Sequence, residues 1–324
     1  MCHYCNNWQS IASSFNIGGV TIHLLLKLPI ASRGKRDLTG QSLCRLQENL
    51  SGVEYIIIDE YSMLGQVNFG WINKRCKQAT GCCNKILGGI SFILFGDPGQ
   101  LPPGADKPLY HAKPTGDVGK EGHQTYRMFD KVVKLTVNQR VQGMSSEQVI
   151  FKDLLLRLRK SQSTVDDWKL LLSRQPAVVS NLSEFDDAIR LFYSNEQVAN
   201  YNHEQIKKLR NAKVMLIMNL WSIVIDIIFK NNQQPPALPV AVIVQFDNYR
   251  GPSFEETCPS CVPICPVTVS LETESGFHER QQLPLRLAWA LTIHKSQGLT
   301  LSKAWIDIGK SERTAESLML QSVE

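Results

Sequence analysis

The sequence contains no apolar stretch that is long enough to cross a membrane. Its longest apolar segment, residues 214–229, is interrupted by Asn219, Ser222 and Asp226, whereas a transmembrane helix needs about 20 mostly apolar residues. Nothing at the N-terminus is typical of a secretory signal or an organelle address. No internal repeat occurs either. We therefore expect no membrane partner and no repeat architecture.

The sequence also has little net charge and no complete metal-binding pattern. Its formal net charge is +5, which is compatible with nucleic acid but does not require it. The nine cysteines are expected to be reduced thiols, because the chain has no secretory signal. Cys258 and Cys261 form a C-x-x-C pair with Cys265 nearby. A zinc site needs four ligands, commonly from two such pairs, so a zinc-binding module is an alternative that lacks its second pair.

Two apolar runs are typical of parallel strands buried on both faces. Residues 53–58 lead directly into Asp59 and Glu60, and residues 92–95 lead into Gly96 and Asp97. Asp59 and Asp97 are 38 positions apart (97 minus 59), which suits a strand-helix-strand unit. The sequence therefore predicts an α/β fold with mostly parallel sheets, whose ligands bind beyond the carboxyl ends of the strands.

Length, composition and apolar periodicity predict the domains and elements of the rest of the chain. A chain of 324 residues suggests two domains or one large domain, and we predict a boundary that separates 1–143 from 144–324. The Pro- and Gly-rich residues 101–122 are predicted to form a loop. Apolar periodicity predicts helices at 67–79, 149–159 and 165–172, a helix that starts near Ser194, and strands at 188–193 and 240–246.

Asp59 and Glu60 form a pair of carboxylates at the end of a predicted strand. One carboxylate could hold Mg²⁺ through water, and the other could orient or deprotonate an attacking water. The alternative is an acidic pair that only opens a loop.

Two further segments carry candidate polar residues. In GDPGQLPP, which starts at Gly96, Asp97 and Gln100 lie on a turn stiffened by prolines. A glutamine side chain can contact a phosphate oxygen and a water together. In KLTVNQR, Arg140 could reach a γ-phosphate. The alternatives are an ordinary Pro-Gly turn and a solvated arginine.

A dense polar cluster follows an apolar run near the C-terminus. Its side chains can bind phosphates of a nucleotide or of nucleic acid, and its glycine allows a backbone to approach closely. The alternative is a helix end capped by glycine, with lysine favoured there by the helix dipole. The residues are Thr292, His294, Lys295, Ser296, Gln297 and Gly298.

Taken in this order, the segments resemble the Pif-one (petite integration frequency) family of ATP-dependent 5′-to-3′ DNA helicases. The resemblance implies two RecA-like domains with ATP and Mg²⁺ as cofactors, and single-stranded DNA and duplex junctions as partners. It also implies a monomer in the nucleus, or in the mitochondrion, that acts in DNA repair, recombination and telomere maintenance. The matching segments cover about residues 17–309 and read NIGGVTIHLLLKLPI, YIIIDEYSML, LFGDPGQLPPG, KLTVNQR, RLFYSNEQVANYN and LPLRLAWALTIHKSQGLTL.

The resemblance also implies roles for single residues. Asp59 would hold Mg²⁺ through water, Glu60 would activate the attacking water, and Gln100 would sense the γ-phosphate. Arg140 would be an arginine finger. Thr21 and His23 would lie along the DNA. Gly96, Asp97 and the cluster from Thr292 to Gly298 would couple DNA binding to the nucleotide.

The sequence departs from the family pattern at the phosphate loop. No G-x-x-x-x-G-K-[ST] motif occurs in the 324 residues, and residues 1–10 contain no glycine. A Gly- and Asn-rich turn and a final Ser-Arg motif are missing as well. We therefore expect poor ATP hydrolysis and a first RecA-like domain that is incomplete at its N-terminus and lacks a central strand. The alternatives are a non-catalytic remnant that binds DNA and a truncated gene product.

Overall fold

The computed structural model describes most of the chain as two compact units. Met1–Ser183 and Ile293–Thr300 belong to the first unit, and Glu184–Thr292 and Leu301–Asp307 belong to the second. The predicted boundary after residue 143 falls among residues outside the described part. In that part, no helix is both long and apolar enough to span a bilayer. The described residues are 2–6, 19–29, 37–137, 146–208, 222–246, 249, 251–273, 276–297, 299, 301 and 303–307.

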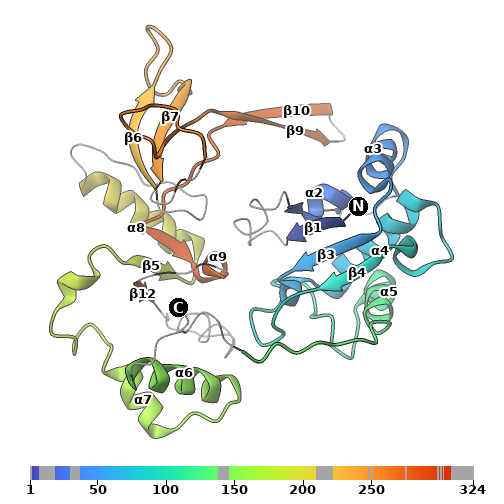
Figure 1. The fold of residues 1–324 in the computed structure, drawn as a ribbon, viewed down its shortest axis with the longest axis horizontal. Helices are drawn as coiled ribbons and strands as arrows, with labels where there is room; N and C mark the ends of the chain where they lie inside the picture. The colour runs from blue at the N-terminus through green and yellow to red at the C-terminus, as the bar shows by residue number, and fades with distance from the viewer. Residues whose placement is uncertain are drawn as a thin grey trace. The chain divides into compact units, whose positions relative to one another are not determined.

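The first unit is built on a parallel sheet (Figure 1). Its strand order is β2-β1-β3-β4, and each neighbouring pair is parallel. In β3, Ile56 and Ile58 are buried while Tyr55 is exposed, as the two-residue period of a strand requires. The predicted α/β fold is thereby confirmed. The strands are β1 (Cys2–Asn6), β2 (Val20–Thr21), β3 (Tyr55–Asp59) and β4 (Ser91–Leu94).

The described strands leave one side of β4 unpaired, so the expectation that this sheet lacks a central strand stays a prediction. Strand β1 lies between β2 and β3, and Cys5 is opposite Val20 on one side and Ile58 on the other. Strand β4 lies at the edge of the sheet, and no described strand pairs with its outer side. Among the described strands, β2 and β4 are therefore the two edges of the sheet.

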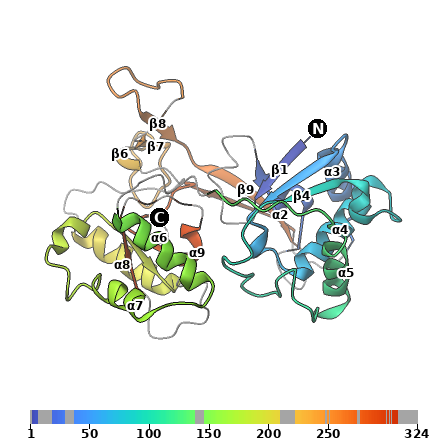
Figure 2. The ribbon, with the colours of Figure 1, turned by 60° about the horizontal axis from the view of Figure 1, so that its bottom comes forward.

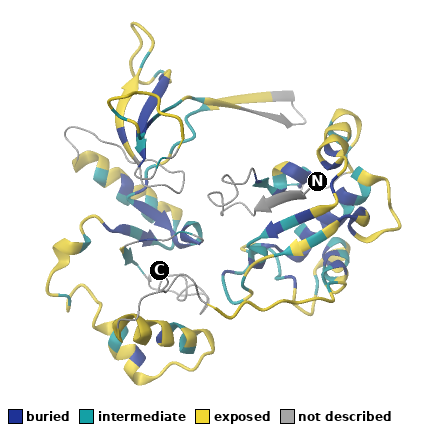
Figure 3. Cartoon of the chain, in the orientation of Figure 1, coloured by how far each residue is buried: buried dark blue, intermediate teal, exposed yellow. Residues whose placement is uncertain are grey.

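Helices α4 and α5 lie side by side against this sheet (Figure 1, Figure 2). Phe69, Ile72 and Cys76 of α4 are fully buried in the core with the isoleucines of β3. Figure 3 colours the chain by burial, with buried residues in dark blue. The helix predicted at 67–79 is confirmed by α4, but part of the predicted loop 101–122 is helical. The bounds are α2 (Ile22–Leu26), α3 (Gly40–Leu50), α4 (Gln66–Thr80) and α5 (Gly116–Tyr126).

The first unit continues with a helical pair, α6 (Ser146–Arg159) and α7 (Val165–Leu172), which confirms both predicted helices. Thr164 accepts a hydrogen bond from the Asp167 backbone N–H, and the Asp167 side chain accepts one from the Thr164 backbone N–H. This capping box satisfies donors at the start of α7. The single-turn 3-10 helices are η2 (Tyr61–Met63), η3 (Ile86–Gly89) and η4 (Leu182–Phe185). The division between the two units, after Ser183, falls within η4.

The second unit combines a small parallel sheet with antiparallel strands. The parallel sheet has the order β11-β5-β12, and α8 packs on it through Asn202, which exchanges two hydrogen bonds with the Ala290 backbone. The predicted strands at 188–193 and 240–246 and the helix start near Ser194 are confirmed. The bounds are β5 (Ile189–Phe192), α8 (Asn195–Lys208), β6 (Ser222–Ile228), β7 (Ala241–Phe246), β8 (Cys261–Ile264), β9 (Val267–Thr273), β10 (Gly276–Gln282), β11 (Ala290–Thr292) and β12 (Ala304–Ile306).

The C-x-x-C pair lies in the second unit, at the start of β8. Cys258 and Cys261 are joined by a disulfide, so the expectation of reduced thiols is wrong for this pair. Among the described residues, no group of three or more His, Cys, Asp or Glu is arranged to hold a metal ion. The pair is therefore not part of a zinc site in the described structure.

Candidate functional site

The acidic pair lies at the carboxyl end of β3. Asp59 is the last residue of the strand, and its Oδ1 accepts a hydrogen bond of 2.9 Å from the Glu60 backbone N–H. Glu60 has φ 55° and ψ 45°, the left-handed region that few residues other than glycine adopt. The next residue, Tyr61, donates its backbone N–H to the Phe95 carbonyl at 3.0 Å. The chain therefore turns sharply at Glu60 and is tied there to the end of β4.

The turn after β4 depends on Gly96. Its φ is +148°, and a Cβ built on it would lie 2.9 Å from the Tyr61 backbone nitrogen. Only glycine fits this close approach without a shift of the backbone. Asp97 follows, and its Oδ1 accepts a hydrogen bond of 2.9 Å from the Gly99 backbone N–H. The two strand ends therefore present Asp59, Glu60 and Asp97 in one region of the first unit.

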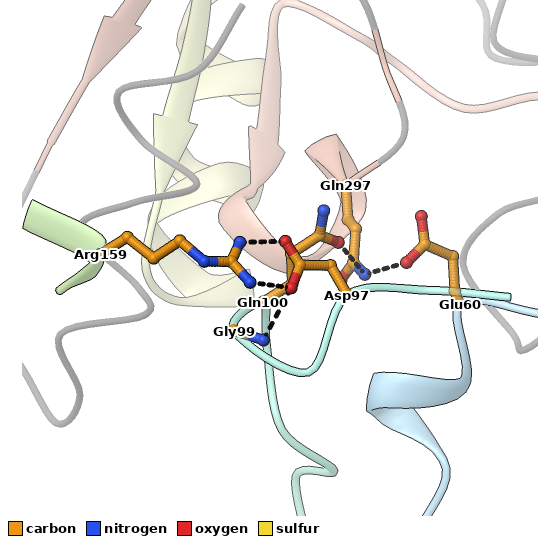
Figure 4. A network of polar contacts seen from close by, with 6 residues as sticks. All are labelled: Glu60, Asp97, Gly99, Gln100, Arg159 and Gln297. Carbon is orange, nitrogen blue, oxygen red and sulfur yellow. Dashed lines mark hydrogen bonds and ion pairs between the residues drawn. The ribbon is translucent and has the colours of Figure 1, made fainter. Parts of the chain in front are cut away.

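Arg159, the last residue of α6, forms a two-pronged ion pair with Asp97 (Figure 4). Burial raises the pKa of Asp97, but the hydrogen bonds from Arg159 and Gly99 and the charge of Arg159 outweigh it and hold that pKa below its usual range. Asp97 is therefore a carboxylate at neutral pH.

Gln297 joins the acidic pair to the proline-rich turn (Figure 4). Its Nε2 donates to Glu60 Oε2 at 2.7 Å and to Gln100 Oε1 at 3.0 Å. The glutamine is 3% exposed, and its Oε1 is buried without a hydrogen-bond partner in the described structure. A buried acceptor of this kind is satisfied by a water or a ligand. The structure thus brings Glu60, Gln100 and Gln297 into one hydrogen-bonded group.

The other residues of the polar cluster surround α9 (Ile293–Ser296). His294 is half-buried, and burial lowers its pKa, so its ring is mostly neutral at pH 7. Ser296 Oγ donates to the Ile293 carbonyl at 2.8 Å, as in an ordinary helical turn. Lys295 is half-buried on α9. Thr292 is buried at the end of β11 and belongs to the second unit.

The remaining candidates lie elsewhere or outside the described residues. Thr21 is the last residue of β2, and His23 follows it on α2. Strand β2 is separated from β3 by β1. Burial lowers the pKa of His23. Arg140 and Gly298 are not among the described residues. Arg159 was missed by sequence reasoning, because it is 62 positions from Asp97 and lies in a helix whose basic residues resemble a solvated face.

The residues at the strand ends suit a magnesium ion better than a transition metal. Mg²⁺ keeps several waters and is usually held by one or two carboxylates and by substrate phosphates. Asp59 and Glu60 supply such carboxylates, and Gln297 holds Glu60 in place. The 324 residues do not contain the glycine-rich loop that cradles phosphates. The site therefore offers two carboxylates suited to Mg²⁺, and the 324 residues contain no glycine-rich loop to hold phosphates beside them.

Comparisons with known proteins point to one family. A family model described as PIF1-like helicase matches residues 9–167. The ATP-dependent DNA helicase Pif1 of Campylobacter jejuni is 25% identical, covering 93% of this chain and 75% of that protein. Human ATP-dependent DNA helicase PIF1 is 28% identical, covering 91% of this chain and 48% of that protein. The chain thus spans about half the length of the human relative.

Solved structures show the same fold. The crystal structure of Pif1 helicase from Candida albicans has a TM-score of 0.67 and 21% identity, covering 99% of this chain and 81% of that one. Pif1 helicase from Bacteroides in complex with ADP-AlF3 and ssDNA has a TM-score of 0.62 and 20% identity, covering 100% of this chain and 80% of that one. At these identities the likeness concerns the fold alone.

Proposed function

We propose that the chain, whose residues 9–167 match the PIF1-like helicase family model, is a PIF1-like helicase and acts as an ATP-dependent DNA helicase. In this function, hydrolysis of ATP at the ends of β3 and β4 drives unwinding of DNA. The observation that carries the proposal is the hydrogen-bonded group of Glu60, Gln100 and Gln297. It joins the acidic strand end, the proline-rich turn and the TIHKSQG segment in one place.

Each residue of the group has a proposed role. Asp59 holds magnesium through water, and the ion neutralises charge on the phosphates when it is bound. Glu60 orients and deprotonates the attacking water, and Gln297 fixes the direction of its carboxylate. Gln100 contacts the γ-phosphate while it shares the Gln297 amide. Asp97 positions the turn through its ion pair with Arg159.

Coupling to DNA is proposed to pass through the TIHKSQG segment. Gln297 contacts Glu60 and Gln100, so movement of α9 would change the site directly. The family resemblance alone supports the remaining proposed properties. These are the arginine-finger role of Arg140, the DNA contacts of Thr21 and His23, the 5′-to-3′ direction of unwinding, and roles in repair, recombination and telomere maintenance.

A second candidate function is DNA binding without efficient hydrolysis. It is favoured by the lack of G-x-x-x-x-G-K-[ST] within the 324 residues. Backbone N–H donors and a lysine supply most of the electrostatic stabilisation in phosphoryl transfer. We therefore expect this polypeptide to bind single-stranded DNA and to turn over ATP slowly, with the residual turnover depending on Glu60.

The test is DNA-stimulated ATP hydrolysis by the purified chain, compared with Glu60→Gln. Loss of a general base slows turnover by about 100-fold or more, whereas Glu256→Gln, on an exposed loop, should leave the rate unchanged. Strand displacement on a forked duplex is measured in parallel. Single-stranded DNA binding without turnover would select the second function. Turnover that is equal in wild type and Glu60→Gln, or no DNA binding at all, would overturn the helicase proposal.

A further inference from the structure

The first unit has a shallow pocket outside the group around Glu60. Its volume is about 370 Å³, and it is lined by Tyr110, Ala112, His123, Tyr126 and Arg127. This volume lies at the small end of the range for ligand pockets. The lining combines two phenol rings, an imidazole and a guanidinium. Such flat groups stack on other flat, electron-rich rings.

The wall that carries Tyr110 is fixed by hydrogen bonds on both sides. Gln66 Nε2 donates to the His111 carbonyl at 2.6 Å, and His123 Nδ1 lies 3.1 Å from the Leu109 carbonyl. Leu109 is buried, whereas the Tyr110 side chain is 52% exposed. The backbone before and after Tyr110 is therefore anchored while its ring faces solvent, which is the arrangement of a preformed binding surface.

The opposite wall is backed by a series of aromatic rings. Tyr126 stacks with Tyr61 at 6.5 Å between centroids and packs against Phe129 at 6.2 Å. Phe129 in turn contacts Phe69, which is fully buried in the core, at 6.1 Å. Tyr126 is therefore held rigidly, so a ligand that stacks there loses little protein side-chain freedom.

Tyr61 lies between this pocket and the acidic site. It follows Glu60 in the chain, and its backbone is bonded to Phe95 at the end of β4. Burial, the charge and hydrogen bond of Tyr126, and the charges of Asp97 and Tyr110 raise the pKa of Tyr61 to about 12. Tyr61 is therefore a neutral phenol at physiological pH, and its ring stacks with Tyr126 of the pocket.

The charge around the pocket favours a ligand with phosphates. Arg127 lines the pocket and is exposed, and Lys113 is next in sequence to the lining residue Ala112. Lys113 is exposed as well. A cation beside two aromatic rings matches a phosphodiester backbone that carries bases. The lining has no glycine-rich turn of backbone N–H groups, which a nucleoside triphosphate would need.

We propose that this pocket binds one unpaired base of single-stranded DNA, stacked on Tyr110 and Tyr126, with Arg127 on the adjacent phosphate. The inference rests on the proposed function only in taking DNA as the polymer. Stacking is tolerant of base identity, because every base has a flat face. Tyr126 stacks with Tyr61, which follows Glu60 in the chain, so we expect a base bound here to affect Glu60 through Tyr61.

The test is equilibrium binding of a labelled oligothymidylate to the full chain, measured by fluorescence anisotropy at fixed salt. We expect Tyr110→Ala to weaken binding about 10-fold and Tyr110→Phe to bind as wild type does. Trp168→Ala is the matched control, because Trp168 is also 52% exposed in the same unit. An oligomer of the same length without bases should bind wild type and Tyr110→Ala equally.

Arg127→Gln supplies a second measurement. Loss of one phosphate contact should lower the slope of log K against log salt by about 0.7 for a single strand. The base-stacking inference is overturned if Tyr110→Ala, Trp168→Ala and wild type bind the oligomer equally, or if Tyr110→Ala weakens binding of an ATP analogue but not of DNA. A wild-type chain that binds no oligomer would overturn both this inference and the proposed function.

Discussion

Gln297 donates one amide group to two acceptors that come from distant parts of the sequence. Glu60 and Gln100 are 237 and 197 positions away. A hydrogen bond to a charged group contributes about 1.5–3 kcal/mol, and this one helps to orient the Glu60 carboxylate. The amide is therefore expected to matter more for turnover than for substrate binding.

We expect Gln297→Ala to lower kcat for DNA-stimulated ATP hydrolysis by about 10-fold and to leave KM for ATP nearly unchanged. Gln233→Ala, in an exposed loop, is the control and should retain wild-type kinetics. Steady-state rates over a range of ATP concentrations separate the two constants. A rise in KM with unchanged kcat would show that Gln297 acts in binding and not in positioning Glu60.

Gly96 illustrates a backbone requirement at the same site. An alanine there would have to keep φ at +148° and place its Cβ 2.9 Å from the Tyr61 nitrogen. We expect Gly96→Ala to lower the free energy of unfolding by about 1–3 kcal/mol. Gly104→Ala has nothing within 4 Å of its Cβ and no positive φ, and should unfold like wild type. Urea denaturation followed by circular dichroism measures both, and equal midpoints would contradict this account.

At the scale of single residues, sequence reasoning selected those that follow strong local signals. Asp59 and Glu60 follow an apolar strand, and Gln100 and Gln297 lie in short polar motifs that end such runs. Arg159 has no such signal, because only the folded chain brings α6 to Asp97. An ion pair between residues far apart in the sequence depends on the tertiary fold, and the local hydrophobic pattern of the sequence does not indicate it.

At the scale of elements, α5 shows how glycine can mislead. Gly116, Gly119 and Gly122 favoured a loop by composition, yet all three lie in α5. One of the three, Gly122, explains the contact with α4 together with Gly70 of α4. A Cβ on Gly122 would lie 1.9 Å from the Gln66 carbonyl oxygen, and a Cβ on Gly70 of α4 would lie 2.1 Å from the Val118 carbonyl oxygen. Close packing of two helices, and not a turn, requires glycine at these positions.

Gly122 and Gly119, which lie about one turn apart on α5, allow a matched test of this packing. Gly122→Ala must separate α4 from α5 and is expected to lower the free energy of unfolding by about 1–3 kcal/mol. Gly119→Ala would place its Cβ 3.6 Å from Val67, an ordinary contact, and should raise stability by up to about 1 kcal/mol through helix propensity. Thermal unfolding of the two variants should therefore shift in opposite directions. Two equal shifts would show that helix propensity alone governs α5.

At the scale of the whole molecule, composition and apolar runs predicted the α/β class, but not the order of strands. Strand β1 is polar and short, with the sequence CHYCN, so it has no pattern of its own. Its place between β2 and β3 comes from pairing with β3 along its full length. The disulfide of Cys258 and Cys261 was likewise unexpected, because spacing alone does not distinguish a disulfide from a metal pair.

The open edge of the first sheet and the chain after α5 suggest a property of the molecule in solution. No described strand covers the outer side of β4. Residues 131–137 adopt no regular structure, and the side chains of Val132, Val133, Leu135 and Val137 are 73–88% exposed. A sheet edge that no described strand covers and an exposed apolar segment both favour association between chains.

We expect the purified chain to bind the dye ANS and to self-associate as its concentration rises, measured by sedimentation velocity. Val133→Lys combined with Leu135→Lys should reduce both effects without loss of thermal stability, because these side chains are more than 80% exposed. Phe254→Lys replaces an isolated side chain, 61% exposed in the second unit, and is the control that should change neither. If the double variant associates like wild type, the segment is not the contact, and the edge of β4 itself becomes the element to block with charged substitutions at Ile93 and Phe95.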